Sequence, residues 1–295
     1  MIVEEKEANT RLDQYLAKQL DLSRSKVQKQ IKDGKVFVNG KKETASYLVK
    51  EKDEIVVEDS LDYTTDIKGE NIDLDIVYED PYLLILNKPS GMVVHPAAGN
   101  YEHTLVNALI GRYETLPGDM VRPGIVHRLD KDTSGVMVVA KEEKTMELLS
   151  KMIANKEIER KYLALVDGVI PHETGTIDAP IGRDVNNRQK MAVTDINSKE
   201  AITHFKVLKR FKENTLIECR LETGRTHQIR VHMRYIGYPI VNDPLYGKRG
   251  KCTPFGQMLH SYSIQFIHPI TKQELYFKVD PPEEFQNKIK ELEQE

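Results

Sequence analysis

The sequence is poor in cysteine and has no long apolar run, and each shortage excludes a class of protein. Only Cys219 and Cys252 occur in 295 residues, and their number and spacing fit neither a disulfide framework nor a zinc motif. No stretch approaches the roughly 18 apolar residues of a membrane-spanning helix. The acidic start MIVEEKEANT lacks the apolar core of a signal peptide, so we expect a cytoplasmic protein with no membrane partner.

The chain as a whole also lacks an excess of positive charge, although two of its segments have one. The formal net charge is −3, which alone predicts no nucleic-acid partner. Residues 10–42 carry 9 Lys and Arg against 3 acids, residues 203–251 carry 11 against 4, and residues 51–80 carry 12 acids against 2 lysines. Because local patches rather than net charge attract a polyanion, two basic segments remain candidates for binding one.

The first 60 residues show the pattern of a small basic module. Apolar residues recur at helical spacing, at Leu12, Tyr15, Leu16 and Leu20. A second helix is predicted from the N-cap Ser23 to Gly34, which is placed as the C′ residue. The segment KVFVNGKK then predicts a strand that enters an Asn-Gly turn.

This helix-helix-strand pattern resembles the small RNA-binding domain first named from a ribosomal protein of the small subunit. Basic residues on its polar faces include Arg11, Arg24 and Lys26. A charge run of this kind is also typical of a solvated helix pair. The resemblance implies instead that these three residues bind RNA.

The rest of the chain is predicted to be a linker and a larger domain. Residues 61–75 are acidic and poor in apolar residues, which predicts a linker between domains of residues 1–60 and 76–295. In the larger domain, apolar runs predict strands at 83–86, 136–140, 162–166, 203–208 and 215–221, with helices at 103–113, 144–156 and 226–236. Strands and helices do not alternate regularly, and no glycine-rich nucleotide loop occurs. We therefore predict an α+β fold around a mixed, mainly antiparallel sheet.

One polar segment, GIVHRLDKDTSG, stands between two apolar runs. His127 and Asp130 are potential metal ligands, but the further His or Cys that a metal site needs is missing from the pattern, so we expect no metal. Ser134 lacks the G-x-S-x-G frame of a hydrolase nucleophile. We interpret residues 132–134 as a polar turn. Asp130 remains a candidate nucleophile or general base.

A second polar segment, LETGRTHQIRVHMRYIG, carries the cations that such a carboxylate needs. A neighbouring cation holds an aspartate in an apolar site in its ionised form, and an arginine can pair with it bidentately. Thr226 is placed to begin a helix whose first turns carry Arg230. Arg230 would then point inward, whereas Arg225 and Arg234 would face the phosphates of a ligand. The alternative is a basic helix that lies wholly on the surface.

Tyr162 is predicted to open the strand KYLALV. A tyrosine there is ordinarily part of the core. It is also suited to stack on a nucleobase turned out of RNA, because such bases are usually held against an aromatic ring.

Seven motifs in one order along the chain resemble those of one family. They are NKPSGMVVHP, GIVHRLDKDTSG, KYLALVDG, IDAPIGRD, LETGRTHQIRVHM, DPLYG and LHSYSIQFIHP. Over roughly residues 10–280 the chain resembles the RluA/RluD family of RNA pseudouridine synthases. The small basic module makes it similar to the RluD-like branch.

The resemblance implies a role for particular residues. It implies that Asp130 is catalytic, that Arg230 rather than Arg225 pairs with it, and that Tyr162 stacks on the target base. It also implies that Arg128 enters the RNA and helps to displace the uridine. The residues expected to contact the RNA in this domain are His127, Arg128, Arg225 and Gln228.

The expected function is the isomerisation of uridine in RNA to pseudouridine by a monomer that uses no cofactor. The resemblance implies large-subunit (23S) ribosomal RNA as the substrate. Whether Asp130 adds to the ribose, adds to the uracil ring or acts as a base stays open. Three alternatives stay open as well, namely a non-catalytic RNA-binding or ribosome-assembly protein, a synthase acting on transfer RNA, and a nucleoside hydrolase.

Overall fold

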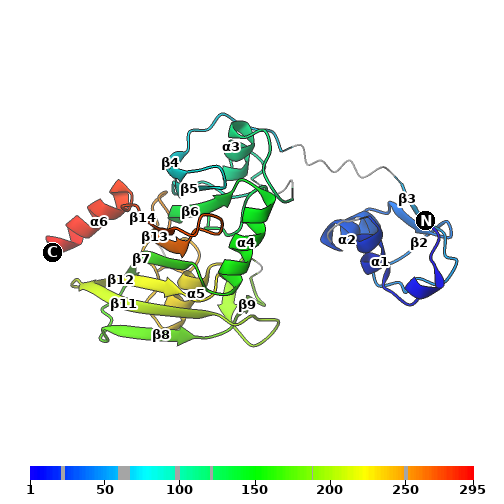
Figure 1. The fold of residues 1–295 in the computed structure, drawn as a ribbon. Coiled ribbons are helices and arrows are strands. Elements are labelled where there is room, and N and C mark those ends of the chain that lie inside the picture. Colours follow the sequence, from blue (N-terminus) through cyan, green and yellow to red (C-terminus); the bar gives the residue numbers. More distant parts are fainter. Residues whose placement is uncertain (21–23, 59–66, 97–99, 120–121, 188, 249–251) are drawn as a thin grey trace. The chain divides into compact units, whose positions relative to one another are not determined.

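Apolar residues form separate cores in two parts of the chain. The computed structural model describes residues 1–20, 24–58, 67–96, 100–119, 122–187, 189–248 and 252–295, without the side chains of residues 25, 26 and 29. Within this description the chain divides into two units, Met1–Asp66 and Ile67–Glu295, each with a core of its own (Figure 1). We describe each unit by itself.

The small unit is a pair of helices packed on a short antiparallel sheet. A 3-10 turn at Glu5–Glu7 precedes α1 (Leu12–Gln19) and α2 (Arg24–Lys32). The strands, in the order β2-β1-β3, are β1 (Val36–Val38), β2 (Lys41–Lys42) and β3 (Ile55–Val57). Both helices and both longer strands contribute to the core, with Leu12, Leu16, Val27, Val36 and Ile55 among its members. The predicted helix-helix-strand module is confirmed.

Two predicted turns of the small unit are present. Gly34 follows α2 with φ +73°, and the amides of residues 34 and 35 close a Schellman motif on the last turn of the helix. Asn39 and Gly40 have φ of 50° and 74°, as a type I′ hairpin turn requires. The predicted N-cap Ser23 lies outside the described residues.

A nine-stranded sheet forms the centre of the large unit. The order is β4-β5-β6-β13-β7-β12-β11-β8, with β14 paired to β13. The β6–β13 pair is parallel and the other pairs are antiparallel, so the predicted α+β fold with a mainly antiparallel mixed sheet is confirmed. The strands are β4 (Asp75–Glu79), β5 (Leu83–Lys88), β6 (Ser134–Ala140), β7 (Glu159–Asp167), β8 (Thr174–Asp178), β11 (Ile202–Arg210), β12 (Asn214–Leu221), β13 (Leu259–Ile267) and β14 (Glu274–Lys278). A separate hairpin pairs β9 (Ile181–Arg183) with β10 (Met191–Val193).

The helices of the large unit are short and cover the sheet. They are α3 (Leu105–Arg112), α4 (Glu143–Ala154), α5 (Gln228–Tyr235) and α6 (Glu283–Glu293). The first three fall where the sequence predicts helices. Within the described ranges, no helix has both the length and the apolar character needed to cross a membrane.

Both faces of the central strands are buried, which explains the unbroken apolar runs Leu83–Leu86 of β5 and Val136–Ala140 of β6. In β5, Leu83 and Ile85 pack with residues of α4, whereas Leu84 and Leu86 pack into the core that includes α3, α5 and α6. Figure 1 shows α4 lying across one side of the strands. Because successive side chains of a strand point to opposite faces, a strand covered on both faces has no polar alternation.

The large unit begins earlier than the sequence suggests. The amide of Glu70 donates to the carbonyl of Asn107 in α3, and the Asn107 side chain donates to the carbonyl of Lys68. A Cβ on Gly69 would lie 2.8 Å from the backbone of Gly111, so the two segments pack through their glycines. Residues 67–75, predicted as part of a linker, therefore belong to the large unit. Their acidic side chains concealed this packing, because backbone groups make the contact. Residues 61–66 of the predicted linker lie outside the described residues.

Candidate active site

Asp130 lies in the loop that precedes β6, and a buried lysine supports this loop. Lys88, at the end of β5, is fully buried. Its ammonium donates to the carbonyls of Pro89, Met92 and Lys131 at 2.7, 2.9 and 3.0 Å. Lys88 therefore ties the loop after β5 to the segment that carries Asp130.

Arg230, in the first turn of α5, bridges two carboxylates. Its Nη1 donates to Asp130 Oδ2 at 2.9 Å, while its Nε and Nη2 donate to the two oxygens of Asp243 at 2.7 and 2.8 Å. The amides of Leu245 and Tyr246 donate to Asp243 Oδ1, so this second carboxylate is itself fixed. The bidentate pair with Asp243 orients the guanidinium, so that its remaining nitrogen, Nη1, is directed at Asp130. The structure thus brings together Arg230 and Asp130, the pair that the sequence favoured.

The surroundings of Asp130 favour its ionised form. Its side chain is 16% exposed, and burial by itself raises the pKa of a carboxyl. The charges of His227 and Arg230 and the hydrogen bond from Arg230 outweigh burial and lower the pKa of Asp130 below its ordinary value. His227 Nε2 lies 4.0 Å from Asp130 Oδ1. Burial lowers the pKa of this imidazole below its ordinary value, which disfavours its charged form. Arg230 is therefore the cation that persists beside Asp130 at neutral pH.

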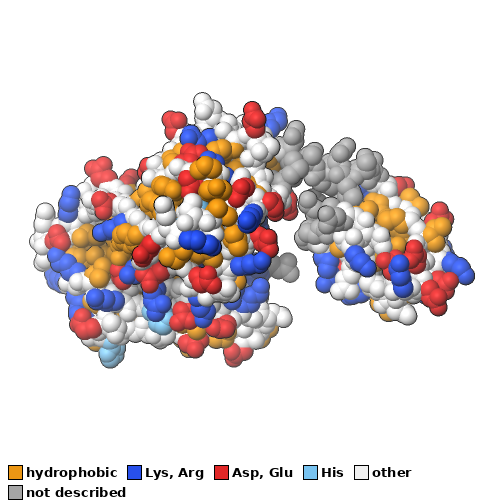
Figure 2. Space-filling view, viewed as in Figure 1, with side chains coloured by type: hydrophobic (Ala, Val, Ile, Leu, Met, Phe, Trp, Pro, Cys, Tyr) orange, Lys and Arg blue, Asp and Glu red, His pale blue; other side chains and the backbone are white. Residues whose placement is uncertain are grey.

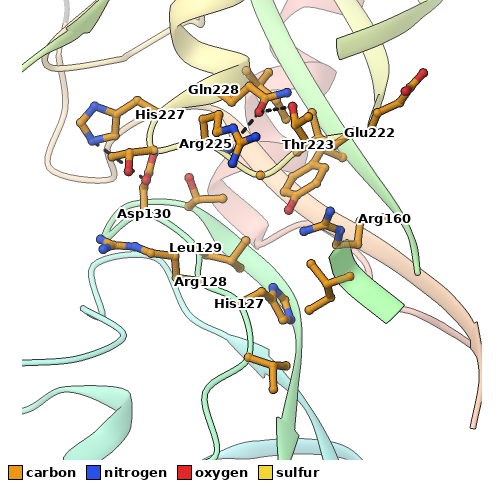
Figure 3. A pocket seen from close by; sticks show the side chains of 18 of the residues that line it. His127, Arg128, Leu129, Asp130, Arg160, Glu222, Thr223, Arg225, His227 and Gln228 are labelled. Atoms are coloured by element: carbon orange, nitrogen blue, oxygen red, sulfur yellow. Dashed lines mark hydrogen bonds and ion pairs between the residues drawn. The ribbon is translucent and has the colours of Figure 1, made fainter. Parts of the chain in front are cut away.

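A cavity of about 540 Å³ is lined by Asp130, by residues of β7 and by the loop that leads into α5 (Figure 3). Tyr162 is buried and lines this cavity. It is the fourth residue of β7, which begins at Glu159, and not the first as predicted. Burial raises the pKa of Tyr162, so its phenol is neutral.

The other residues predicted to contact RNA in this domain also line the cavity, but they differ in exposure and in their hydrogen-bond partners. Arg128 is exposed, and its Nη1 lies 3.1 Å from Nε2 of His95. Arg225 is half-buried, and its Nε donates to the carbonyl of Glu200 at 2.8 Å. His127 accepts a hydrogen bond from the amide of Val138 through its Nε2 at 3.0 Å.

Gln228 is buried and braces the loop before α5. Its Oε1 accepts from the amide of Arg225 and the hydroxyl of Thr223, and its Nε2 donates to the carbonyl of Ile202 and the hydroxyl of Thr203. These four bonds use the full capacity of the amide, so none is left for RNA. Because the preceding residue, 227, has a left-handed φ of 58°, α5 begins at Gln228 rather than at Thr226 as predicted.

The segment interpreted as a polar turn is more buried than expected. Thr133 and Ser134 are each at most 2% exposed. The side chain of Gln257 donates to the Thr133 hydroxyl, and Ser134 Oγ lies 2.8 Å from Nδ1 of His260. These groups join the start of β6 to the segment around β13, so they do not cap a surface turn. Nowhere in the described ranges do three or more His, Cys, Asp or Glu side chains form a group suited to a metal ion.

The predicted RNA-binding arginines of the small unit share one buried acid. Arg11 and Arg24 both donate to Asp13, whose side chain is fully buried. The hydrogen bond from Arg11 lowers the pKa of Asp13 well below its usual range. The two arginine side chains are 39% and 48% exposed, so both remain partly accessible to solvent. The side chain of Lys26 lies outside the described residues. On the face drawn in Figure 2, Lys and Arg side chains of this unit alternate with acidic ones.

The chain matches two family models. Residues 82–235 match the model for RNA pseudouridylate synthase, and residues 10–55 match the S4 domain. The first match covers most of the elements around Asp130. The chain belongs to the RNA pseudouridine synthase family. Members of this family isomerise uridine in RNA to pseudouridine, and the present chain is such an enzyme.

Individual relatives agree with this assignment. The chain is 48% identical over 291 residues to the "Uncharacterized RNA pseudouridine synthase YlyB" of Bacillus subtilis (strain 168), covering 98% of this chain and 96% of that one. It is 43% identical over 292 residues to "Ribosomal large subunit pseudouridine synthase D" of Pseudomonas aeruginosa, covering 93% and 89%. The solved structure of "Human RNA Pseudouridylate Synthase Domain Containing 1" is 26% identical with a TM-score of 0.60, covering 72% of this chain and 86% of that one.

Three residues of the site received no role from the sequence alone. Asp243 holds Arg230, the ring of Tyr246 lies 5.1 Å from the guanidinium of Arg230, and His227 bonds to the hydroxyl of Tyr246 at 2.9 Å. Asp243 and Tyr246 both belong to the motif DPLYG, which was noted without a function. The pairing of a buried carboxylate with a cation leaves no periodic pattern in the sequence. The motif DPLYG was therefore the sequence signal that could have identified Asp243.

Proposed function

We propose that Asp130 is the catalytic carboxylate of this synthase and that the cavity around it receives the target uridine. The observation that supports this best is the arrangement of charges around Asp130, where Arg230 lies at 2.9 Å and is itself held by Asp243. A carboxylate that stays ionised in a half-closed pocket is suited to act as a nucleophile or a base.

The reaction makes an isomer of its substrate, so it requires no oxidant, reductant or added atom. The N-glycosidic bond breaks, the uracil turns, and the ring rejoins the ribose through carbon. Asp130 adds to the anomeric carbon, adds to the uracil ring, or removes a proton from the ribose to leave a glycal. In each route the detached or altered base must stay in place, and Tyr162 in the cavity wall offers a face on which it stacks.

In this proposal Arg128 enters the RNA. It is exposed at the rim of the cavity, where its Nη1 lies 3.1 Å from Nε2 of His95. Turning a uridine out of a stack costs a few kcal/mol, and the cost is lowest in loops and at mismatches. An arginine that takes the place of the displaced base reduces this cost.

We propose large-subunit ribosomal RNA as the substrate. The support comes from relatives, because chains 39–48% identical to this one carry the name ribosomal large subunit pseudouridine synthase D. The S4 domain and the basic segment of residues 203–251 would both contact phosphates. The same proposal places the enzyme in the cytoplasm, and we propose that it acts as a monomer.

The test is a map of pseudouridines in ribosomal RNA from cells that lack the gene. The cells are then complemented with wild type or with Asp130→Asn. We expect discrete sites in large-subunit RNA to lose pseudouridine and to regain it only with wild type. Sites that return with Asp130→Asn would rule out this residue as the catalyst. Loss confined to transfer RNA would replace the substrate and leave the proposed site intact.

A further inference from the structure

An arginine inside the cavity has no partner. Arg160, in β7, is 6% exposed and lines the same cavity as Asp130. Its Nε is buried without a hydrogen-bond partner, and the structure shows no other hydrogen bond or ion pair of this guanidinium within the described ranges. Buried polar groups are nearly always paired, and an unpaired buried charge is strongly unfavourable. The Arg160 guanidinium is therefore available to a ligand that brings a hydrogen-bond acceptor into the cavity.

Three carboxylates line the cavity, of which Glu222 and Asp130 are already engaged and the third, Glu200, is exposed. Glu222 also lines the cavity, but its two oxygens lie 2.6 Å from Lys156 Nζ and 2.6 Å from His204 Nε2. Figure 3 shows the Glu222 side chain directed away from Arg160. Asp130 is bound by Arg230. The charge of Arg160 is thus left for a ligand.

The position of Arg160 identifies which part of the RNA it would meet. Arg160 and Tyr162 are two residues apart in a strand and both are buried, so they lie on one face. Figure 3 shows Arg160 and Asp130 on opposite sides of the pocket. A base that stacks on Tyr162 with its ribose toward Asp130 directs its ring toward Arg160. A backbone phosphate is expected instead at the exposed rim, where Arg128 lies.

A second donor lies close to Arg160. His127 accepts a hydrogen bond at Nε2 from the amide of Val138, so its proton is on Nδ1, which is buried and also has no partner. Burial and the charge of Arg160 lower the pKa of His127 to about 3, so the imidazole stays neutral. Gly224 lies over the guanidinium, since a Cβ there would come within 3.3 Å of Arg160 Nη1. Side-chain donors without acceptors therefore gather at this end of the pocket.

We propose that Arg160 is a further catalytic residue, which binds a carbonyl oxygen of the target uracil and stabilises the negative charge that forms on the ring during isomerisation. The inference rests on the proposed function of the Asp130 cavity. It assigns Arg160 to the negative charge on the uracil, whereas Arg230 holds the Asp130 carboxylate.

The electron count requires such a group whichever route Asp130 takes. If Asp130 bonds to C1′ or removes a ribose proton, the C1′–N1 bond breaks with its electron pair on the uracil, whose negative charge spreads over O2 and O4. If Asp130 adds to C6, the electron pair of the C5–C6 bond moves to C5 and O4. In the first route C5 bonds to C1′ as the C1′–O bond to Asp130 breaks, and in the second C5 bonds to C1′ of the glycal double bond while Asp130 returns its proton to C2′. In both routes C5 then loses its proton and N1 gains one. In the third route the sugar transfers to C5 before Asp130 leaves C6. A preorganised cation beside these oxygens lowers the barrier in every case.

The experiment measures binding and chemistry separately. The substrate is a transcript of 23S ribosomal RNA labelled with tritium at C5 of uridine, so released tritium reports the loss of the C5 proton. For Arg160→Met we expect the single-turnover rate constant to fall about 10²–10³-fold, as when one donor to a developing oxyanion is removed. The apparent Kd for the transcript should change by less than about threefold. Arg160→Lys keeps the charge and should retain more activity than Arg160→Met.

The matched control is Arg112→Met, which removes an arginine that is bound to Glu79 at the surface of α3. We expect this variant to keep the wild-type rate constant and Kd. A normal rate constant for Arg160→Met would overturn the proposal. So would a weaker Kd with a normal rate at saturation, because that result assigns Arg160 to phosphate binding.

A second measurement covers the case in which Arg160→Met does not fold. Transcripts made with 2-thiouridine or 4-thiouridine replace one ring oxygen by sulfur, a weaker acceptor, and the product is measured by chromatography of the nucleosides. One of the two should slow the wild type markedly but slow Arg160→Lys much less. Equal slowing of both enzymes by both analogues would contradict the proposal.

The variant Asp130→Asn distinguishes failure of the proposed function from failure of this inference. An active Asp130→Asn would overturn the proposed site. An inactive Asp130→Asn together with a fully active Arg160→Met would overturn only the role proposed for Arg160.

Discussion

At the scale of single residues, the chemistry of the site depends on how charges are paired. Asp130, Arg230 and Asp243 form a chain of two acids and one base, and this chain leaves Asp130 ionised though it is only 16% exposed. Asp243 is fully buried, so its carboxylate requires Arg230 as much as Arg230 requires it. Asp130 is thus held by a cation whose own position is fixed by Asp243.

The pH dependence of the reaction should report this pairing. In Arg230→Gln combined with Asp243→Asn, burial still raises the pKa of Asp130 while the lowering by Arg230 is gone. A carboxylate acts when ionised, so activity is lost as the pH falls through its pKa. We expect the acid limb of the single-turnover rate to move to higher pH than in wild type. An unmoved limb would show that Arg230 does not set this pKa. Asp243→Asn alone is the control, since it keeps the Arg230–Asp130 contact.

Lys88 provides a second prediction at this scale. Lys88→Met keeps the length of the side chain but removes the donor to the carbonyls of Pro89, Met92 and Lys131, the last of which still accepts from the amide of Gly91. We expect a cost of about 3 kcal/mol in the free energy of unfolding. Urea denaturation measures the change. Lys144→Met, an exposed substitution in α4, is the matched control and should stay within about 0.5 kcal/mol of wild type. Equal midpoints of urea denaturation for the two variants would show that the hydrogen bonds of Lys88 do not stabilise the fold in this way.

At the scale of elements, the site depends on the parallel contact between β6 and β13. Ser261 pairs with Gly135, and a Cβ on Gly135 would lie 2.1 Å from the Ser261 carbonyl oxygen. Gly135 also has φ of +115°, outside the range that other residues adopt easily. The close approach of these strands places the Asp130 loop, which leads into β6, beside the strand β7 that carries Tyr162.

Gly135→Ala should therefore destabilise the large unit by several kcal/mol, because it combines a backbone clash with an unfavourable φ. Thermal and urea denaturation measure the loss. Gly91→Ala is a control for the dihedral angle alone, since Gly91 has φ of +86° with open space around it. We expect the control to cost about 1–2 kcal/mol. If Gly135→Ala costs no more than Gly91→Ala, the strands separate more easily than their packing suggests.

At the scale of the whole molecule, charge is divided between two units. The small unit is not basic as a whole, since residues 1–66 carry 12 Lys and Arg against 14 acids, but its helices and hairpin present exposed lysines such as Lys32, Lys41 and Lys42. Each phosphate neutralised by a protein releases counterions, so binding to RNA weakens as salt rises. Phosphate contacts by these lysines would add to those made around the cavity.

Replacing Lys32, Lys41 and Lys42 by Gln should weaken RNA binding and flatten its dependence on salt. The slope of log K against log salt should fall by about 0.7–0.9 for each phosphate contact that is lost. The single-turnover rate at saturating RNA should stay at the wild-type value, because these residues lie in a different unit from Asp130. Filter binding across a range of salt concentrations measures the effect.

The control replaces three exposed lysines near the C-terminus, Lys272, Lys278 and Lys290, by Gln. The change in net charge is the same, so any general effect of charge appears in both variants. A salt slope that falls equally in the two would show that RNA does not contact the small unit in particular.

The sequence by itself determined the elements with strong local signals. The helical spacing from Leu12 onward, the Asn39-Gly40 turn and the apolar strands Leu83–Lys88 and Ser134–Ala140 all have the predicted structure. It also determined the motifs that led to Asp130 and Arg230. These features depend on residues close together in the chain, so their physical cause can be read from a short segment.

The tertiary structure decided what depends on distant residues. The packing of residues 67–75 on α3, the bond from Arg230 to Asp243 and the bracing role of Gln228 join segments that no local pattern connects. The unpaired state of Arg160 is of the same kind, because a residue lacks a partner only with respect to everything that surrounds it in space. Pattern and spacing identified the chemical groups of this enzyme, and long-range packing decided which of them have partners among the described residues.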